Sequence, residues 1–291
     1  MLGHCRSDAL MHDTDNWHAW WRLLLPLSRR FRWRHNKLPN LLIPRGFNEK
    51  LLRRIIFDRR PQLTEVAGKL GARAVVLRLT NDARLLPHLH AVVHDPAEID
   101  TLELPERFVM KGNHGSGMVA FHTGPGLPDR AALKRMAAEW LGTDYGRDSL
   151  EWCYVGVERA VMFEEYLQAA EGIPSDYKFL CFGGRVEVIQ YSSSRFSGHT
   201  ISLFDRNWQI LPAQLGKYPR HDTPTPRPSR FADMVALAEK LSAGWDFIRV
   251  DLYQVGEEIK FGELTNYPFG AGAAFSPAEW ERRIGDYWTL A

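Results

Sequence analysis

The chain has 291 residues, of which 45% are hydrophobic, so it is long enough for two lobes or one large α/β domain with a real core. Its formal net charge of +2 gives no bulk electrostatic case for a nucleic-acid binder. Three widely spaced cysteines without a CxxC pair argue against a disulfide scaffold or a zinc knuckle. With no signal peptide and no membrane-spanning stretch evident, we predict a cytoplasmic protein.

Residues 1–45 are predicted to form a Trp- and Arg-rich helical segment. Helical spacing relates Trp17, Trp20, Trp21, Leu24 and Leu25, and a basic run of Arg29, Arg30, Arg32, Arg34 and Lys37 follows. Tryptophan beside arginine is typical of an interfacial helix on an anionic membrane, so residues 17–37 are a candidate peripheral membrane contact. The alternative is a helix packed on the body of the protein, with its arginines solvated or paired.

Two amphipathic helices are predicted next, over residues 48–60 and 63–77. Residues 85–100 suggest a strand and a turn. His88 and His90 in this region could be metal ligands, but the neighbouring Leu and Pro residues favour an ordinary loop edge.

A glycine-rich connection, residues 112–117, joins predicted strands at 108–111 and 118–121. Its backbone N–H groups can reach a phosphate without obstruction from Cβ atoms. It is not a Walker A loop, because Lys111 precedes the glycines, and it is not a Rossmann turn, because a strand follows it. A glycine hairpin with a lysine on its first strand is typical of a flexible nucleotide lid.

Further elements are predicted along the rest of the chain. A helix at 129–141 and a strand at 161–163 precede a hairpin at 177–192 that turns at Gly183-Gly184. A Pro-rich surface loop at 212–229 leads into a helix that ends at Gly244.

Residues 245–265 indicate a strand, a turn and a second strand. If residues 256–258 form a three-residue loop, Val255 pairs with Ile259 and Asp251 lies opposite Glu263. Two facing carboxylates repel each other, and a bound Mg²⁺ removes that repulsion. The alternative is a solvated hairpin with charges at its edge.

The chemistry-bearing residues follow one order along the chain: Lys69, Lys111 with its glycine loop, Glu164-Glu165-Tyr166-Leu167, Asp176-Tyr177-Lys178, Arg249-Val250-Asp251 and Phe261-Gly262-Glu263. This order, from about Pro44 to the C-terminus, resembles the ATP-grasp superfamily, and most closely its TupA-like branch, named for teichuronopeptide biosynthesis. The resemblance implies an α+β ATP-grasp fold whose two α+β lobes grip ATP. It also implies an N-terminal subdomain at 46–104, a lid subdomain at 105–167 and a C-terminal subdomain with the metal site at 168–291.

The resemblance also implies a role for each motif. The phosphates of ATP would be bound by Lys69 and Lys111, under a mobile loop that contains Gly112, Gly115, Ser116 and Gly117. Adenine and ribose would be bound by the hinge residues Glu164, Glu165, Tyr166 and Leu167, and the γ-phosphate and the acyl phosphate by Lys178 and Arg249. Mg²⁺ would be bound by Asp251, Glu263 and Asn266. Many members place Asn two residues after the metal-binding Glu, where this chain has Thr265. Either Asn266 is the ligand through a local bulge, or Thr265 replaces it.

The leading hypothesis is an ATP-dependent carboxylate–amine ligase that acts through an acyl phosphate. By resemblance, its setting is cell-surface polysaccharide or polymer biosynthesis, such as attachment of an amino acid to a uronic acid. The alternatives are a kinase-like phosphotransferase and an inactive nucleotide-binding module. Candidate acceptor contacts are Arg195, His199 and the loop from Lys217 to Arg227, and the oligomeric state is left open.

Overall fold

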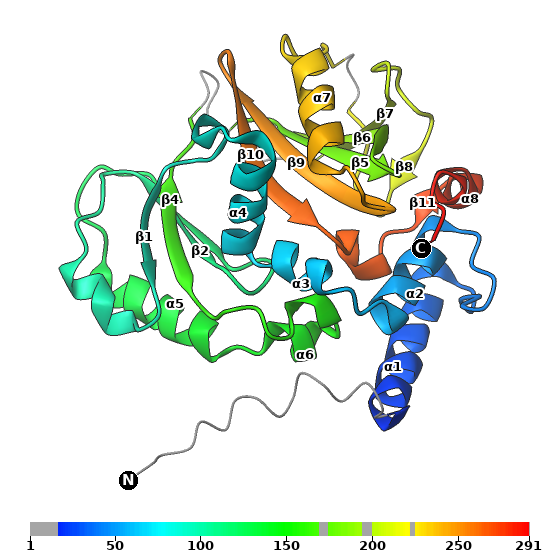
Figure 1. Cartoon of the computed structure of the whole chain (residues 1–291), viewed down its shortest axis with the longest axis horizontal. Helices are drawn as coiled ribbons and strands as arrows, with labels where there is room; N and C mark the ends of the chain where they lie inside the picture. The colour runs from blue at the N-terminus through cyan, green and yellow to red at the C-terminus, as the bar shows by residue number, and fades with distance from the viewer. Residues whose placement is uncertain (1–16, 169–173, 194–199, 222–224, 291) are drawn as a thin grey trace.

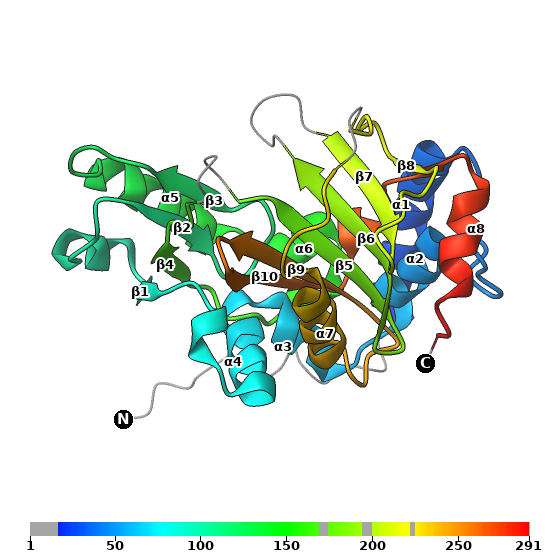
Figure 2. The ribbon, with the colours of Figure 1, turned by 90° about the horizontal axis from the view of Figure 1, so that it is seen from above.

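The computed structural model describes residues 17–168, 174–193, 200–221 and 225–290. It has an α+β architecture with two main antiparallel sheets that lie beside each other and a two-stranded sheet of β8 (Gln214–Leu215) and β11 (Phe275–Ser276). Helices α3 (Pro61–Ala67) and α4 (Lys69–Thr80) lie close to both main sheets (Figures 1 and 2). The predicted residues Arg195 and His199 and part of the loop around 217–227 lie outside the described residues.

The larger sheet has the strand order β10-β9-β5-β6-β7. Its strands are β5 (Asp176–Phe182), β6 (Arg185–Ser193), β7 (Thr200–Asp205), β9 (Phe247–Val255) and β10 (Glu258–Thr265). The predicted hairpin at Gly183-Gly184 is confirmed, and both glycines have the positive φ that such a turn requires. Helix α7 (Phe231–Leu241) packs on one face of this sheet, where the Cys181 thiol contacts the Ala238 carbonyl.

Alternation along the strands divides the side chains of the larger sheet between two environments. Phe179 and Val250 pair across β5 and β9, and both are fully buried. The next pair is Lys178 and Asp251, which project from the opposite face, away from α7. Farther along that same face, Phe182 and Phe247 pair and are buried against Phe47, so both faces of the sheet contribute to the core and the polar residues occupy one part of the second face.

The smaller sheet has the order β1-β4-β2-β3. Its strands are β1 (Leu89–Val93), β2 (Phe108–Gly112), β3 (Val119–His122) and β4 (Val161–Glu165). Helix α5 (Arg130–Gly142) and the 3₁₀ segment η2 (Pro96–Thr101) cover it over a separate core that includes Phe108 and Phe163. Because β1 pairs with β4, this sheet begins at residue 89, before the predicted subdomain boundary at 104.

The remaining elements connect and flank the sheets. They are α1 (Trp17–His35), α2 (Phe47–Phe57), α3 (Pro61–Ala67), α4 (Lys69–Thr80), η1 (Ala83–Leu85), α6 (Tyr145–Ser149), η3 (Trp152–Tyr154), β8 (Gln214–Leu215), η4 (Pro268–Ala271), β11 (Phe275–Ser276) and α8 (Glu279–Asp286). The single helix predicted over 63–77 is wrong, because the backbone is extended at Gly68. That break places Lys69 at the first position of α4.

The predicted pairing of Val255 with Ile259 is also wrong. Val255 pairs with Glu258, and a β-bulge at Gly262 shifts the register by one residue. Asp251 lies opposite Glu263 as predicted. The bulge also separates Phe261, which is buried, from Glu263, whose side chain is 46% exposed.

Helix α1 packs on the body through one face. Leu27 and Phe31 join the main core, and Arg30 donates to the carbonyls of Ser149 and Gly270, both at 3.2 Å. His35 Nε2 lies 2.8 Å from the Ala271 carbonyl oxygen. Among the described helices, none has the length and apolar character needed to cross a bilayer.

Candidate nucleotide and metal site

The polar face of the larger sheet holds a buried charge cluster. Lys178 Nζ lies 2.6 Å from Asp176 Oδ2 and also donates to Asp251 Oδ2. Arg249 and Asp251 come from the same side of β9 and are 6% and 1% exposed. Strand alternation thus brings Asp176, Lys178, Arg249 and Asp251 onto one surface, because each pair is two residues apart in its strand.

The guanidinium of Arg249 joins the two facing carboxylates. Its Nε and Nη2 donate to Asp251 Oδ1 and Oδ2, each at 2.7 Å, and Nη2 also reaches Glu263 Oε1 at 2.6 Å. Thr265 Oγ1 accepts from Nη2 at 3.0 Å and donates to Glu263 Oε1 at 2.8 Å. Within the described part of the chain, Arg249 donates its hydrogen bonds through Nε and Nη2 and not through Nη1. The Nη1 group can therefore donate to an anionic ligand.

The ionisation states of the carboxylates follow from this arrangement. Burial raises the pKa of Glu263, but the positive charges of Arg249, Lys178 and Lys69 outweigh burial and hold that pKa well below its usual value. For Asp251, burial is the largest influence and raises the pKa, while Arg249 and Lys178 act in the opposite direction. Glu263 is therefore a fixed anion at neutral pH.

The cluster suits a hard divalent cation by charge and by ligand type. It contains two basic groups, Lys178 and Arg249, and three carboxyl groups, Asp176, Asp251 and Glu263, so acidic groups outnumber basic ones. Mg²⁺ typically takes one or two carboxylates and completes its shell with phosphates and waters. Glu263 Oε2 makes none of the hydrogen bonds in the described part of the chain, and its side chain is partly exposed, so it can serve as a ligand.

Thr265 and Asn266 lie differently with respect to this cluster. Thr265 contacts both Arg249 and Glu263. The buried Asn266 side chain instead donates to the Leu63 carbonyl oxygen of α3 at 2.7 Å. The only shift within β10 is at Gly262, ahead of Glu263, so no bulge turns Asn266 toward the cluster. Thr265 therefore lies within the cluster, whereas the Asn266 side chain is directed to α3.

Lys69 lies beneath the predicted lid loop. Its Nζ donates to the carbonyl oxygens of Gly112 and Gly115, both at 2.7 Å. The buried Asn113 fixes the loop to α4, since its Oδ1 accepts from Leu70 N at 2.9 Å and its Nδ2 donates to the Glu158 carbonyl at 2.8 Å. The sequence pattern predicts the loop but not the anchoring role of Asn113, although an Asn inside a glycine loop is itself a turn signal. Ser116 and Gly117 are exposed at the tip of the loop.

A second group of charges lies on the smaller sheet beside α4. Glu164 is buried and accepts from Lys111 at 2.6 Å and from Arg73 at 2.7 Å. With Lys69, this lid-side group has three cations and one carboxylate, so its net charge is positive. Lys69 and Glu263 lie near enough for each to influence the pKa of the other. A positive group that suits phosphates thus lies close to a carboxyl-rich cluster that suits a divalent cation.

The rest of the predicted hinge follows Glu164. Glu165 faces the β1 edge, where its backbone N–H and its carboxylate bond the backbone of His88 at 2.8 and 3.0 Å. The ring of Tyr166 meets Phe121 edge-on at a centroid separation of 6.4 Å, and Leu167 is half-buried beyond it. Of the two glutamates, Glu164 is therefore the one placed with Lys111.

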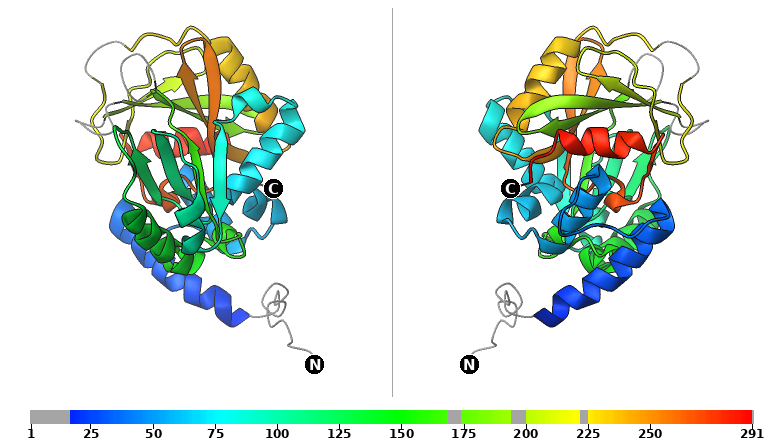
Figure 3. Two further views of the ribbon diagram at one scale, coloured as in Figure 1. Left: turned by 90° about the vertical axis from the view of Figure 1, so that its left-hand side faces the viewer. Right: turned by 90° about the vertical axis from the view of Figure 1, so that its right-hand side faces the viewer.

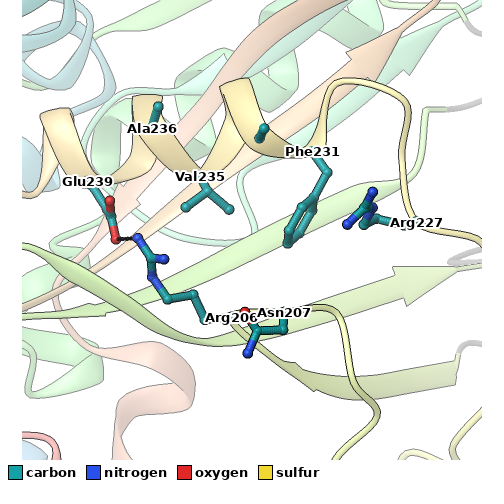
Figure 4. A pocket seen from close by; sticks show the side chains of 8 residues that line it. Arg206, Asn207, Arg227, Phe231, Val235, Ala236 and Glu239 are labelled. Carbon is teal, nitrogen blue, oxygen red and sulfur yellow. Dashed lines mark hydrogen bonds and ion pairs between the residues drawn. The ribbon is translucent and has the colours of Figure 1, made fainter.

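Two other features lie away from these groups. His88 and His90 contact each other edge-on. Among the described residues, no three His, Cys, Asp or Glu side chains are grouped closely enough to hold a metal ion, and this includes the carboxylates of the larger sheet. A surface hollow beside α7 is lined by Arg206, Arg227, Phe231 and Glu239, among others (Figure 4). It includes Arg227, the last residue of the candidate acceptor loop, and none of the residues predicted to bind the nucleotide or the metal.

If the lid-side group binds ATP, as the resemblance implies, the affinity for ATP should depend on pH through Lys69. Burial lowers the pKa of Lys69 to about 8, against the opposing charge of Glu263. Lys69 is charged below that pH and loses its charge above it, so the Kd for ATP should rise by up to about tenfold per pH unit above pH 8. Lys69→Arg keeps its charge and should flatten the profile. Identical pH profiles for the two proteins, measured by isothermal titration calorimetry, would contradict this role.

Comparison with known proteins identifies a family. A family model described as TupA-like ATPgrasp matches residues 49–289, which leaves α1 outside the match. No curated protein matches the sequence.

Similar solved structures include D-alanine–D-alanine ligases and an ATP-grasp ligase. The Helicobacter pylori D-alanine–D-alanine ligase has a TM-score of 0.40 and 12% identity, over 71% of this chain and 53% of that chain. The Bacillus anthracis D-alanine–D-alanine ligase gives 0.39 and 16%, over 71% and 59%. The ATP-grasp ligase PsnB with a minimal precursor gives 0.38 and 14%, over 78% and 60%. The chain thus spans between 53% and 60% of the length of these proteins.

Proposed function

Because this chain belongs to the TupA-like ATP-grasp family, we propose that it is an ATP-dependent ligase that joins a carboxylate to an amine. The observation that carries the proposal is the pair of charge groups described above. Three cations at the lid side suit the phosphates of ATP, and the Asp251–Arg249–Glu263 cluster suits the divalent cation that accompanies them. We place the reaction in the cytoplasm, where ATP is available, and in the synthesis of a cell-surface polymer.

The reaction requires an activated carboxylate. A carboxylate oxygen attacks the γ-phosphorus of ATP, which forms an acyl phosphate and releases ADP; an amine then attacks the acyl carbon, expels phosphate and loses a proton. Both reactants are anions, so cations must bring them together. Lys69 and Lys111 would hold the nucleotide phosphates. Arg249 Nη1 and Lys178 would stabilise the charge on the group in transfer.

Magnesium would be held by Glu263 and Asp251, near Thr265. When bound, it would neutralise phosphate charge and orient the γ-phosphate. The glycine loop, residues 112–117, would close over the phosphates and exclude water, which protects an acyl phosphate from hydrolysis. Asn113 would anchor that loop to α4 during closure.

The acceptor would approach Arg249 along the polar face of the larger sheet. A narrow cavity there is bounded by Arg249, Gln190 and Leu180 from the sheet, and by Asn48 and Phe269 from the helical side. The cavity has an accessible volume of about 10 Å³, which is room for about one water, so a sugar acid would bind only after Phe269 and its neighbours move apart. A uronic acid as acceptor and an amino acid as the amine donor are our preferred substrate classes.

A product assay tests the proposed reaction. The full chain is incubated with Mg-ATP, with pooled uronic acids, with pooled amino acids, and with both pools, and ADP, AMP and free phosphate are measured. We expect ADP and phosphate to rise together only when both pools are present, and mass spectrometry then identifies the amide. ADP without free phosphate, with a phosphorylated acceptor, would replace the ligase with a phosphotransferase. ATP binding without turnover on any pool would favour an inactive nucleotide-binding module.

A further inference from the structure

The surface of α1 and the segment after it have a composition unlike the rest of the chain. From residue 16 to residue 48 there are seven Lys and Arg residues and no Asp or Glu. The family match begins only at residue 49, so this stretch lies outside the matched part of the chain. Helix α1 also projects from the body, as both views in Figure 3 show.

Packing divides α1 into two faces with different roles. Leu27 and Phe31 face the core, whereas Leu25, Arg29, Arg32 and Trp33 are exposed. Their spacing of four, seven and eight residues from Leu25 places these exposed residues on one side of the helix, opposite the packed side. The helix therefore presents arginines together with large apolar side chains to solvent.

The exposed apolar residues continue beyond the helix. Trp33 is 75% exposed and Leu42 is 92% exposed, and Leu38 and Ile43 are exposed between and beside them. Arg34 lies over the Trp33 ring, 4.5 Å from its centroid. Within the described part of the chain, no carboxylate forms an ion pair with Arg29, Arg32 or Arg34.

We propose that this basic apolar surface, formed by Leu25, Arg29, Arg32, Trp33, Arg34, Leu38, Leu42 and Ile43, docks the protein on an anionic lipid bilayer. Arginines with an aromatic and several aliphatic side chains match the phosphate and acyl-chain boundary of such a membrane. The phosphates of a nucleic acid could pair with the arginines, but a nucleic acid would offer no apolar environment for the exposed aliphatic side chains. The proposal goes beyond the proposed reaction, because docking does not require ATP turnover, and the two can fail independently.

Vesicle sedimentation tests the docking surface. The full chain is mixed with vesicles of phosphatidylcholine alone or of phosphatidylcholine with phosphatidylglycerol. We expect selective binding to the anionic vesicles that weakens as salt is raised, since the arginines interact with the surface charge. The triple substitution Arg29→Gln, Arg32→Gln and Arg34→Gln should lower the partition coefficient about a hundredfold.

Two further variants separate charge from apolar insertion. Trp33→Ser with Leu42→Ser should also weaken vesicle binding, while leaving every arginine in place. The control removes three exposed arginines elsewhere, Arg135→Gln, Arg282→Gln and Arg283→Gln, and should bind vesicles like the parent chain. Equal loss in the control, equal binding to neutral vesicles, no binding to either vesicle, or preferential capture of an RNA or DNA oligonucleotide would each overturn the proposal. So would self-association that buries Trp33, detected by sedimentation velocity and abolished by the serine substitutions.

Discussion

The variant Glu263→Gln should lose Mg²⁺-dependent turnover, by about a hundredfold or more, while its fold remains intact. The substitution removes a carboxylate whose pKa is held well below its usual value and whose side chain is the most exposed of the three in the cluster. Arg249 keeps its contacts with Asp251 and Thr265, so the core of the cluster should persist. Initial rates across a Mg²⁺ titration measure the effect, and thermal unfolding checks the fold.

The matched control for this variant is Glu258→Gln. Glu258 is on the same strand, β10, and its exposed side chain pairs with Lys260 at 3.0 Å. It should retain full turnover and the parental Mg²⁺ dependence. Full activity in Glu263→Gln would remove the metal assignment and the main support for the proposed reaction.

The variant Arg249→Met should be destabilised by about 3–5 kcal/mol at neutral pH and should lose activity. Methionine fills much of the space but leaves Asp251, Glu263 and Asp176 with Lys178 as their only close cation in the cluster. Uncompensated carboxylates in a buried setting are costly unless they take up protons. Urea unfolding of the parent and the variant measures the difference.

The pH dependence of this destabilisation has a defined sign. In the parent chain, the depressed pKa of Glu263 contributes stability above the ordinary glutamate pKa, and this is lost as pH falls through the folded-state pKa. Without Arg249, the pKa of Glu263 should rise and protonation should relieve the repulsion. The destabilisation should therefore be smaller at pH 5 than at pH 7.5.

An exposed arginine provides the comparison for Arg249. Arg283 lies on α8 and pairs with Glu279 at 3.3 Å, with both side chains largely exposed. Exposed ion pairs contribute little, so Arg283→Met should change stability by less than about 1 kcal/mol. Equal destabilisation in the two variants, or a loss in Arg249→Met that does not vary with pH, would contradict the role assigned to the cluster.

Local patterns were sufficient for the strands that carry the site. The alternation in Asp176-Tyr177-Lys178 and Arg249-Val250-Asp251 predicts which residues share a face, because side chains of an extended strand alternate whatever the strand pairs with. The glycine pair at 183–184 similarly specifies its own turn. The position of Asp251 opposite Glu263 was correct, although the assumed loop was not: a shorter turn and the Gly262 bulge compensate each other.

The sequence by itself therefore determined the residue types, their order along the chain and the face of the strand from which each projects. Only the tertiary structure decided their partners, because those partners are distant in sequence and depend on register and packing. It turned Asn266 to Leu63 in α3, brought Thr265 to Arg249, and placed Lys69 against the glycine loop after the break at Gly68. It also packed one face of α1 on the body and left the other face exposed. Helical spacing shows which residues of α1 share a face, but which face is buried depends on the part of the protein that α1 packs against.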